Sequence, residues 1–158
     1  MALDSKLQRK IMGRFATGVT VVTTAGSGGM GGLTANAVAS LSLEPALVLV
    51  AVDKGASSYA EINANGCYAI NILSRDHEEI SRRFSTPGPK DFSGFKWKTA
   101  VTGAPILEDA LGYVDCQLYE ILPGGDHDIF IGQIVAGDVR EDGQPLLYFS
   151  GKYRQLAE

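Results

Sequence analysis

The chain has 158 residues, of which 45% are hydrophobic and 20% are charged, and its formal net charge is −4. This length is typical of one domain with its own core, so we expect residues 1–158 to fold as a single domain. The acidic balance disfavours nucleic-acid binding, and no segment is apolar over the length of a membrane span, which predicts a cytoplasmic protein without nucleic-acid or membrane partners.

The N-terminal part of the chain predicts a helix and a hairpin. Leu7 and Ile11 lie four residues apart on one face, which predicts an amphipathic helix over about residues 4–15. β-Branched residues predict a strand over 17–26. A glycine-rich turn separates it from a second strand over 33–43, so we expect the two strands to pair.

The second of these strands carries a polar face. Small polar side chains fall on its even positions and apolar side chains on its odd positions. The polar positions are Thr34, Asn36, Ser40 and Ser42. Such a face can hydrogen-bond a flat heterocycle, but a solvent-facing barrel exterior fits the pattern equally well.

A strand over 46–52 is apolar on both faces and leads into a short helix over about 57–65. Ser58 and Glu61 predict a capping box at the start of this helix, and Gly66 suits its end.

The start of this helix is a candidate anion site. Free N–H groups and the helix dipole attract negative charge there, while Lys54 adds charge, and Ser57 and Ser58 add hydroxyl donors. An ordinary capped helix is the simpler interpretation of this stretch alone, since it has no Walker A or Rossmann glycine pattern.

A third helix is expected over 74–85, with Ser74 as its N-cap and His77 on its solvated side. Arg82 and Arg83 near its end suit the helix dipole, or alternatively clamp a phosphate. The segment 85–95 that follows is the best candidate for a flexible loop.

Strands dominate the rest of the chain. They are expected over 67–73, 112–122, 129–135 and 145–149. Val114 and Leu118 share one face with Cys116, whereas Asp115 and Gln117 share the other, which predicts a half-buried strand. Cys67 and Cys116 are expected to be buried and reduced. Many short strands joined by tight turns, with three small helices, predict a mainly β fold built as a closed or partly closed antiparallel barrel.

The segment Asp126-His127-Asp128 lies between a Gly-Gly turn and an apolar strand. A metal site, a catalytic base, a cofactor contact and a plain surface turn are all open interpretations. No second histidine or cysteine is nearby, which disfavours a metal, and no GxSxG elbow supports a catalytic triad.

Several segments together resemble one family. They are GRFATGVTVVTT, GLTANAVASLSLEP, RRF, GDH before IFIGQI, and PLLYF before a tyrosine. Their order and spacing resemble the flavin reductase-like family, whose members have an FMN-binding split-barrel fold. The similarity runs from Gly13 to Leu156 and is greatest to the short reductase components of two-component flavin-dependent monooxygenases.

The resemblance implies a homodimeric oxidoreductase that transfers hydride from NADH or NADPH to FMN or FAD. The reduced flavin would pass to a separate flavin-dependent monooxygenase component. His127 would contact the nicotinamide nucleotide at the catalytic centre, and no metal is implied. The residues expected to bind or border the flavin are Thr34, Ala35, Asn36, Ser40, Ser42, Asp53, Lys54, Ser57, Ser58, Arg82, Arg83, Tyr148, Gly151 and Tyr153.

The lack of a strong acid–base constellation agrees with this interpretation, since the two cofactors carry the hydride chemistry themselves. Asp128 is a departure from the family pattern, in which threonine is common after the histidine. Two other classes compete: a split-barrel flavoprotein that retains FMN for electron transfer or redox sensing, and a barrel that binds no flavin and serves as an interaction module. The GDH segment favours the reductase because it has no role in either alternative.

Overall fold

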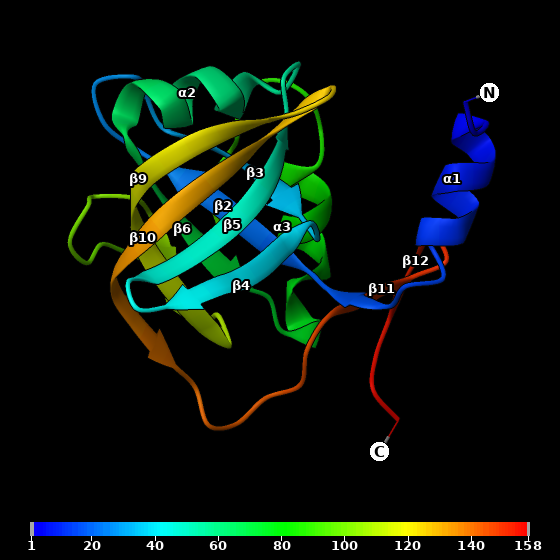
Figure 1. Ribbon diagram of the computed structural model, residues 1–158. Helices are drawn as coiled ribbons and strands as arrows, with labels where there is room; N and C mark the ends of the chain where they lie inside the picture. The colour runs from blue at the N-terminus through cyan, green and yellow to red at the C-terminus, as the bar shows by residue number, and fades with distance from the viewer. Residues whose placement is uncertain (1, 158) are drawn as a thin grey trace.

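The computed structural model describes residues 2–157, and its main feature is a curled seven-stranded antiparallel sheet (Figure 1). The strand order is β3-β2-β6-β9-β10-β5-β4. The strands are β2 (Thr20–Thr24), β3 (Gly31–Ala35), β4 (Val38–Leu43), β5 (Ala46–Asp53), β6 (Cys67–Ile72), β9 (Gly112–Gly124) and β10 (His127–Val139). This architecture confirms the predicted mainly β, antiparallel barrel.

The barrel is split between β3 and β4. These strands are at opposite edges of the sheet order, although only residues 36 and 37 separate them in the chain. The predicted single strand over 33–43 is therefore wrong. The chain crosses from one edge of the sheet to the other at this corner, so β3 pairs with β2 while β4 pairs with β5. The predicted hairpin is confirmed for β2 and β3 alone.

The corner also breaks up the predicted polar face. Thr34 belongs to β3 and Asn36 to the corner, but Ser40 and Ser42 belong to β4, where the ladder with β5 is irregular between them. A register shift of one residue reverses the face that a side chain occupies, so these four residues do not share one surface.

Two large apolar clusters, with a small third one around Ile106, form the core of the described residues. One fills the barrel and includes Val50, Tyr68 and Phe130, each with no exposed surface. The other lies beneath α3 (Glu78–Phe84), which packs on β2 and β3 and contributes Ile80 and Phe84. Cys67 and Cys116 are both free and buried, as predicted.

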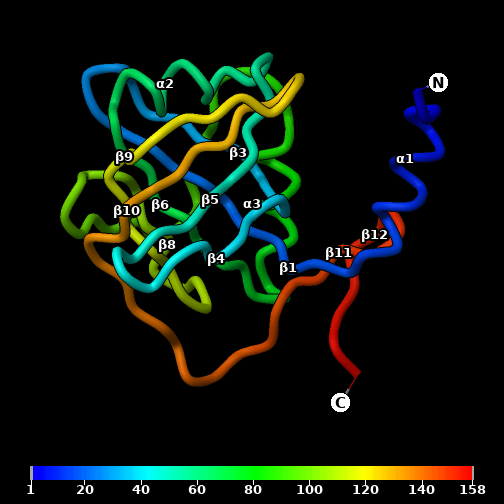
Figure 2. The backbone as a smooth tube through the Cα atoms, viewed as in Figure 1, coloured from blue at the N-terminus to red at the C-terminus, as the bar shows by residue number. Residues whose placement is uncertain are grey.

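The helices divide between the barrel and a separate arm. Helix α2 (Ser57–Asn65) lies across one end of the barrel, and the 3-10 turn η1 (Arg75–His77) precedes α3. Helix α1 (Ser5–Met12) stands away from the barrel beside a small sheet, as Figure 2 shows. That sheet comprises β1 (Thr17–Gly18), β11 (Leu147–Phe149) and β12 (Lys152–Arg154), and a further two-stranded sheet comprises β7 (Trp97–Lys98) and β8 (Ile106–Leu107). Within the described residues, no helix is long and apolar enough to cross a membrane.

Two predictions about single polar residues are wrong. His77 is 6% exposed rather than solvated, because its Nδ1 accepts the N–H of Ser74 at 3.0 Å as part of a capping box. Asp115 is fully buried rather than on a solvated strand face. A loop covers that face, and its Val101 and Thr102 N–H groups donate to Asp115 Oδ2 at 2.8 and 2.9 Å.

Candidate functional site

A groove of about 490 Å³ lies where the start of α2 faces β3 and the end of α3. Its walls come from three parts of the chain: β3, the turn from β5 into α2, and the loop after α3. The lining residues are Leu33, Thr34, Asp53, Gly55, Ala56, Ser57, Ser58, Phe84, Ser85, Thr86, Pro87, Gly88 and Lys90. The groove thus contains four residues that the sequence predicted for the site: Thr34, Asp53, Ser57 and Ser58.

Helix α2 begins at Ser57 and ends before Gly66, whose φ of 68° suits a C-terminal glycine, so its predicted bounds are confirmed. The predicted capping box at Ser58 is wrong, because the N-cap is Ala56 and no side chain among the described residues caps the helix. The positive end of the α2 dipole therefore faces the groove without a side-chain cap. Such an end favours an anionic ligand.

The loop after α3 supplies a cation that the sequence did not indicate. Lys90 Nζ donates to the carbonyl oxygens of Thr86 at 2.5 Å and Gly88 at 2.8 Å, so its ammonium lies in the groove wall. Burial lowers the pKa of Lys90, and the nearby Glu61 partly opposes that effect. Ser57 Oγ donates to the Gly88 carbonyl at 3.4 Å and joins the loop to α2. No local pattern marks this lysine, because only the return of the loop to α2 brings it to the groove.

A second hollow, of about 630 Å³, adjoins the groove through Ser85 and Thr86, which line both. Its other lining residues are Glu78, Arg82, Tyr148, Gly151, Lys152 and Tyr153. A smaller hollow of about 190 Å³ brings Thr34 and Asn36 beside Tyr148 and Tyr153. Thr34 of β3, Asn36 of the corner and the aromatic residues near the C-terminus therefore border one continuous site.

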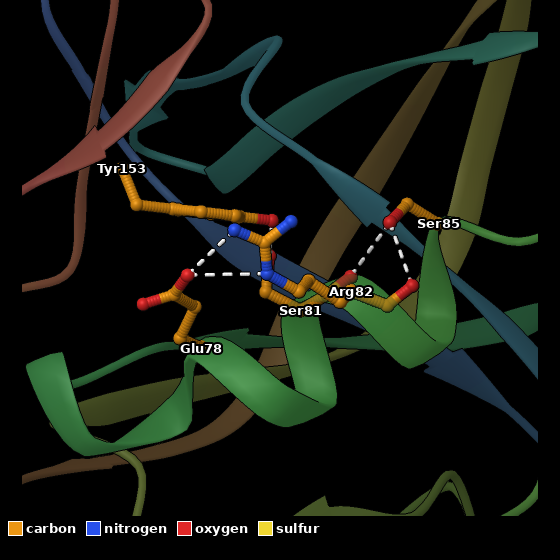
Figure 3. Close-up of polar contacts among 5 residues, drawn as sticks. All are labelled: Glu78, Ser81, Arg82, Ser85 and Tyr153. Atoms are coloured by element: carbon orange, nitrogen blue, oxygen red, sulfur yellow. Dashed lines mark hydrogen bonds and ion pairs between the residues drawn. The ribbon is translucent and has the colours of Figure 1, made fainter.

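Figure 3 shows how Arg82 is held in this second hollow. Its Nε and Nη2 atoms donate to Glu78 Oε1 at 3.1 and 2.7 Å, and its guanidinium lies 4.8 Å over the Tyr153 ring. The Tyr153 hydroxyl is 2.6 Å from Ser81 Oγ, which joins β12 to α3. Arg82 is thus presented to the hollow as a positioned cation with one flat face stacked on an aromatic ring.

The two arginines of the RRF segment have different surroundings. Arg83 points to the following loop, where its Nη1 donates to the carbonyls of Asp91 at 3.1 Å and Ser93 at 2.6 Å. It also pairs with Glu79 at 3.0 Å. Arg82 lines the site, whereas Arg83 anchors the loop that follows α3.

The two β4 serines lie elsewhere. Ser40 is exposed and Ser42 half-buried, and neither lines the groove or its two adjoining hollows. Ala35 is buried at 7% exposure, and its carbonyl accepts from Thr20 Oγ1. The Thr34 hydroxyl donates to the Ser81 carbonyl at 2.6 Å, so this side chain already has a protein partner.

His127 is the first residue of β10 and lies opposite Asp53 of β5. Its Nδ1 is 2.7 Å from Asp126 Oδ1, and this contact lowers the pKa of Asp126. The side chain of His127 is 43% exposed. An imidazole fixed at Nδ1 by a carboxylate presents Nε2 outward, which suits contact with a second molecule.

Asp128 points the other way, under α2. Its Oδ2 accepts the Tyr59 hydroxyl at 2.6 Å, and its Oδ1 lies 3.7 Å from Lys54 Nζ. The hydrogen bond to Asp128 raises the pKa of Tyr59. Asp126 and Asp128 thus have separate roles: one contacts His127, and the other links β10 to the start of α2.

Comparison with known proteins agrees with this geometry. A family model described as "Flavin reductase like domain" matches residues 12–157. The chain is 41% identical over 150 residues to FMN reductase (NADH) RutF 2 of Rhizobium rhizogenes, covering 94% of this chain and 87% of the relative. It is 36% identical over 153 residues to HsaB of Rhodococcus jostii, the reductase subunit of a flavin-dependent monooxygenase, covering 96% of this chain and 78% of that one. The solved structure of flavin reductase PheA2 superposes with a TM-score of 0.89 at 42% identity, covering 99% and 100% of the two chains.

Proposed function

Because this chain belongs to the flavin reductase like domain family, we propose that it oxidises NADH, reduces FMN and releases the reduced flavin to a monooxygenase component. The observation that carries the proposal is the groove at the start of α2, whose lining combines the positive end of a helix dipole with two serines and Lys90. A flavin phosphate has the charge that such a site favours.

We infer the orientation of the flavin from the same groove. With the phosphate at Ser57 and Ser58, the isoalloxazine ring extends toward Thr34 and Asn36. The adjoining aromatic pair, Tyr148 and Tyr153, offers a flat surface to a bound ring, since their own rings meet edge to face at 5.4 Å. The second hollow beside Arg82 leaves room for the adenylate half of FAD, so we expect FAD to be accepted as well.

His127 is our candidate for contact with the nicotinamide nucleotide. The bound substrates carry the hydride transfer between them, so the protein has to bring their rings together and hold them. His127 suits this task because Asp126 contacts one of its ring nitrogens and because it lies opposite Asp53, a groove residue, although His127 itself lines neither the groove nor its two adjoining hollows. NADH is the nucleotide named for the FMN reductase relative, and NADPH is the alternative to be compared.

We also propose that two copies of the chain associate. Helix α1 has no buried residue, and its apolar side chains Leu7 and Ile11 are 46% and 52% exposed. The edge strand β4 presents Leu41 and Leu43, which are 47% and 92% exposed. Apolar surface of this kind is characteristic of an interface, and a second copy covers it. Light scattering on the purified chain should give twice the monomer mass, and a monomer at micromolar concentration would exclude the dimer.

Oxidation of NADH, followed by its absorbance with and without FMN, FAD or riboflavin, tests the activity. Flavin-dependent oxidation of many equivalents of NADH per protein is the expected result, and the same assay with NADPH ranks the nucleotides. If no flavin supports oxidation, the reductase function is wrong. Retention of yellow colour through gel filtration would then identify a protein that binds FMN without exchanging it.

A further inference from the structure

Lys54 is turned away from the groove that its neighbours line. Asp53 and Gly55, on either side of it, are both groove residues, and so are the next three residues of the chain. The Lys54 side chain instead reaches Asp128, with Nζ 3.7 Å from Oδ1. The Lys54 ammonium is next to the candidate anion site in the chain, but it is directed to the Asp128 carboxylate.

Asp128 is the fixed partner in this pair. Its side chain is 12% exposed, against 51% for Lys54, and its other oxygen accepts the Tyr59 hydroxyl at 2.6 Å. Tyr59 is itself held by an edge-to-face contact with Phe130, 5.0 Å between ring centroids. Because Asp128 is held in place by Tyr59 and the lysine stem is flexible, the carboxylate determines where the ammonium lies.

The backbone holds the same two segments together. The Lys54 N–H donates to the Asp126 carbonyl at 3.1 Å, and Asp128 lies opposite Val52 in the β5–β10 ladder. The root of the Lys54 side chain is thus fixed next to the groove. Only the side chain has to move for its ammonium to reach a ligand there.

We propose that Asp128 withholds Lys54 from the flavin phosphate and so weakens the binding of phosphate-bearing flavins. The proposal rests on the proposed function in that it takes the ligand of the groove to be a flavin phosphate. The physical reason is competition: the ammonium cannot pair closely with Asp128 and with a phosphate in the groove at the same time, and the carboxylate partly neutralises its charge. Weak binding suits a flavin that must leave the protein as a reduced product.

Asp128→Asn removes the negative charge and keeps an oxygen to accept the Tyr59 hydroxyl. Quenching of flavin fluorescence measures the dissociation constants of FMN and of riboflavin, which has the same ring and ribityl chain but no phosphate. We expect FMN to bind roughly tenfold more tightly to the variant and riboflavin to bind as it does to the unchanged chain. The gain for FMN should shrink at high salt, since it is electrostatic.

Asp138→Asn is the matched control. It removes one carboxylate from the same strand, and Asp138 lies near the other end of β10, outside the groove and both adjoining hollows. It should leave the FMN dissociation constant unchanged, which separates a local effect from a change in net charge. Asp128→Thr, which removes the charge and keeps a hydroxyl oxygen, is the second variant should the asparagine lower the folded fraction.

Lys54→Met identifies the cation that is released. The tighter binding of FMN should disappear when Lys54→Met is added to Asp128→Asn, and Lys54→Met alone should weaken FMN binding less than it does when added to Asp128→Asn. An unchanged FMN affinity in folded Asp128→Asn, or an equal gain for riboflavin, would overturn the proposal. Oxidation of NADH by the unchanged chain is measured in parallel, so a failure of the proposed function is seen separately from a failure of this inference.

Discussion

Replacing Lys90 with methionine tests whether the loop after α3 binds the flavin phosphate. Methionine keeps most of the length of the side chain and removes its charge. A hydrogen bond to a charged group contributes roughly 1.5–3 kcal/mol. Lys90 already donates to two carbonyls that it need not release entirely, so the lower end applies. We therefore expect a loss of about 1.5 kcal/mol, which is slightly more than tenfold in the FMN dissociation constant.

Riboflavin distinguishes the role of the charge from the role of the loop. The carbonyls of Thr86 and Gly88 lose a donor in Lys90→Met, so the loop could become less ordered and affect any ligand. Titration of both flavins by fluorescence should show the loss for FMN alone. An equal loss for riboflavin would mean that Lys90 only shapes the groove, and no loss for either flavin would place the phosphate elsewhere.

Three further substitutions examine the nucleotide contact, a buried cap and the barrel core. His127→Ala should raise the KM for NADH at least tenfold and change the FMN dissociation constant less than twofold, and unchanged steady-state kinetics with NADH would refute the assigned contact. Burial lowers the pKa of His77 in the folded state, and nearby carboxylates only partly oppose this effect. In the pH range between this lowered pKa and the ordinary histidine pKa of about 6.5, the unfolded chain therefore binds more protons than the folded chain. The free energy of unfolding by urea should therefore fall as the pH drops through this range. His77→Gln, which can retain the capping box, should flatten this pH dependence. Parallel pH profiles of the variant and the unchanged chain would contradict the assignment to His77. Tyr68→Phe removes a fully buried hydroxyl that donates to the Phe130 carbonyl at 2.9 Å and should cost about 1.5 kcal/mol of unfolding free energy, with a cost near zero arguing against that hydrogen bond.

Local rules predicted the elements whose ends carry a chemical signal. Helix α2 has its predicted bounds because Gly66 adopts a left-handed conformation that stops a helix. The break after Ala35 has only a weak signal: the alternation of apolar and polar residues is interrupted at Ala37-Val38-Ala39, and no glycine or proline marks the corner. Its cause is tertiary: the chain must change edges for the sheet to close into a split barrel. The same limit applies to Asp115, whose burial depends on a loop that only the folded chain brings over it.

The residues of the candidate site also divide into those that local sequence predicted and those that only tertiary contacts bring together. Ser57 and Ser58 were predicted from a helix start, and they line the groove, because the chemistry of a helix N-terminus is local. Lys90 could not be predicted, because it is more than thirty residues away from Ser57 in sequence and nothing near it resembles a binding motif. Lys54 was predicted as a ligand from its position, and its contact with Asp128 could not be predicted because it depends on the pairing of β10 with β5.

Lys54 and Lys90 are expected to contribute differently to the affinity for FMN. Lys90 is in the wall of the groove and should strengthen FMN binding, whereas Asp128 directs Lys54 away and should prevent it from adding to that binding. If release of reduced FMN limits turnover, Asp128→Asn should lower kcat with FMN and leave kcat with riboflavin unchanged, because only FMN gains affinity. Lys90→Met should raise kcat with FMN while also raising its KM. Stopped-flow measurement of flavin reduction, compared with steady-state turnover on the same samples, separates release from the hydride step. A slower reduction step in Asp128→Asn would show that the carboxylate affects the reacting rings rather than the phosphate.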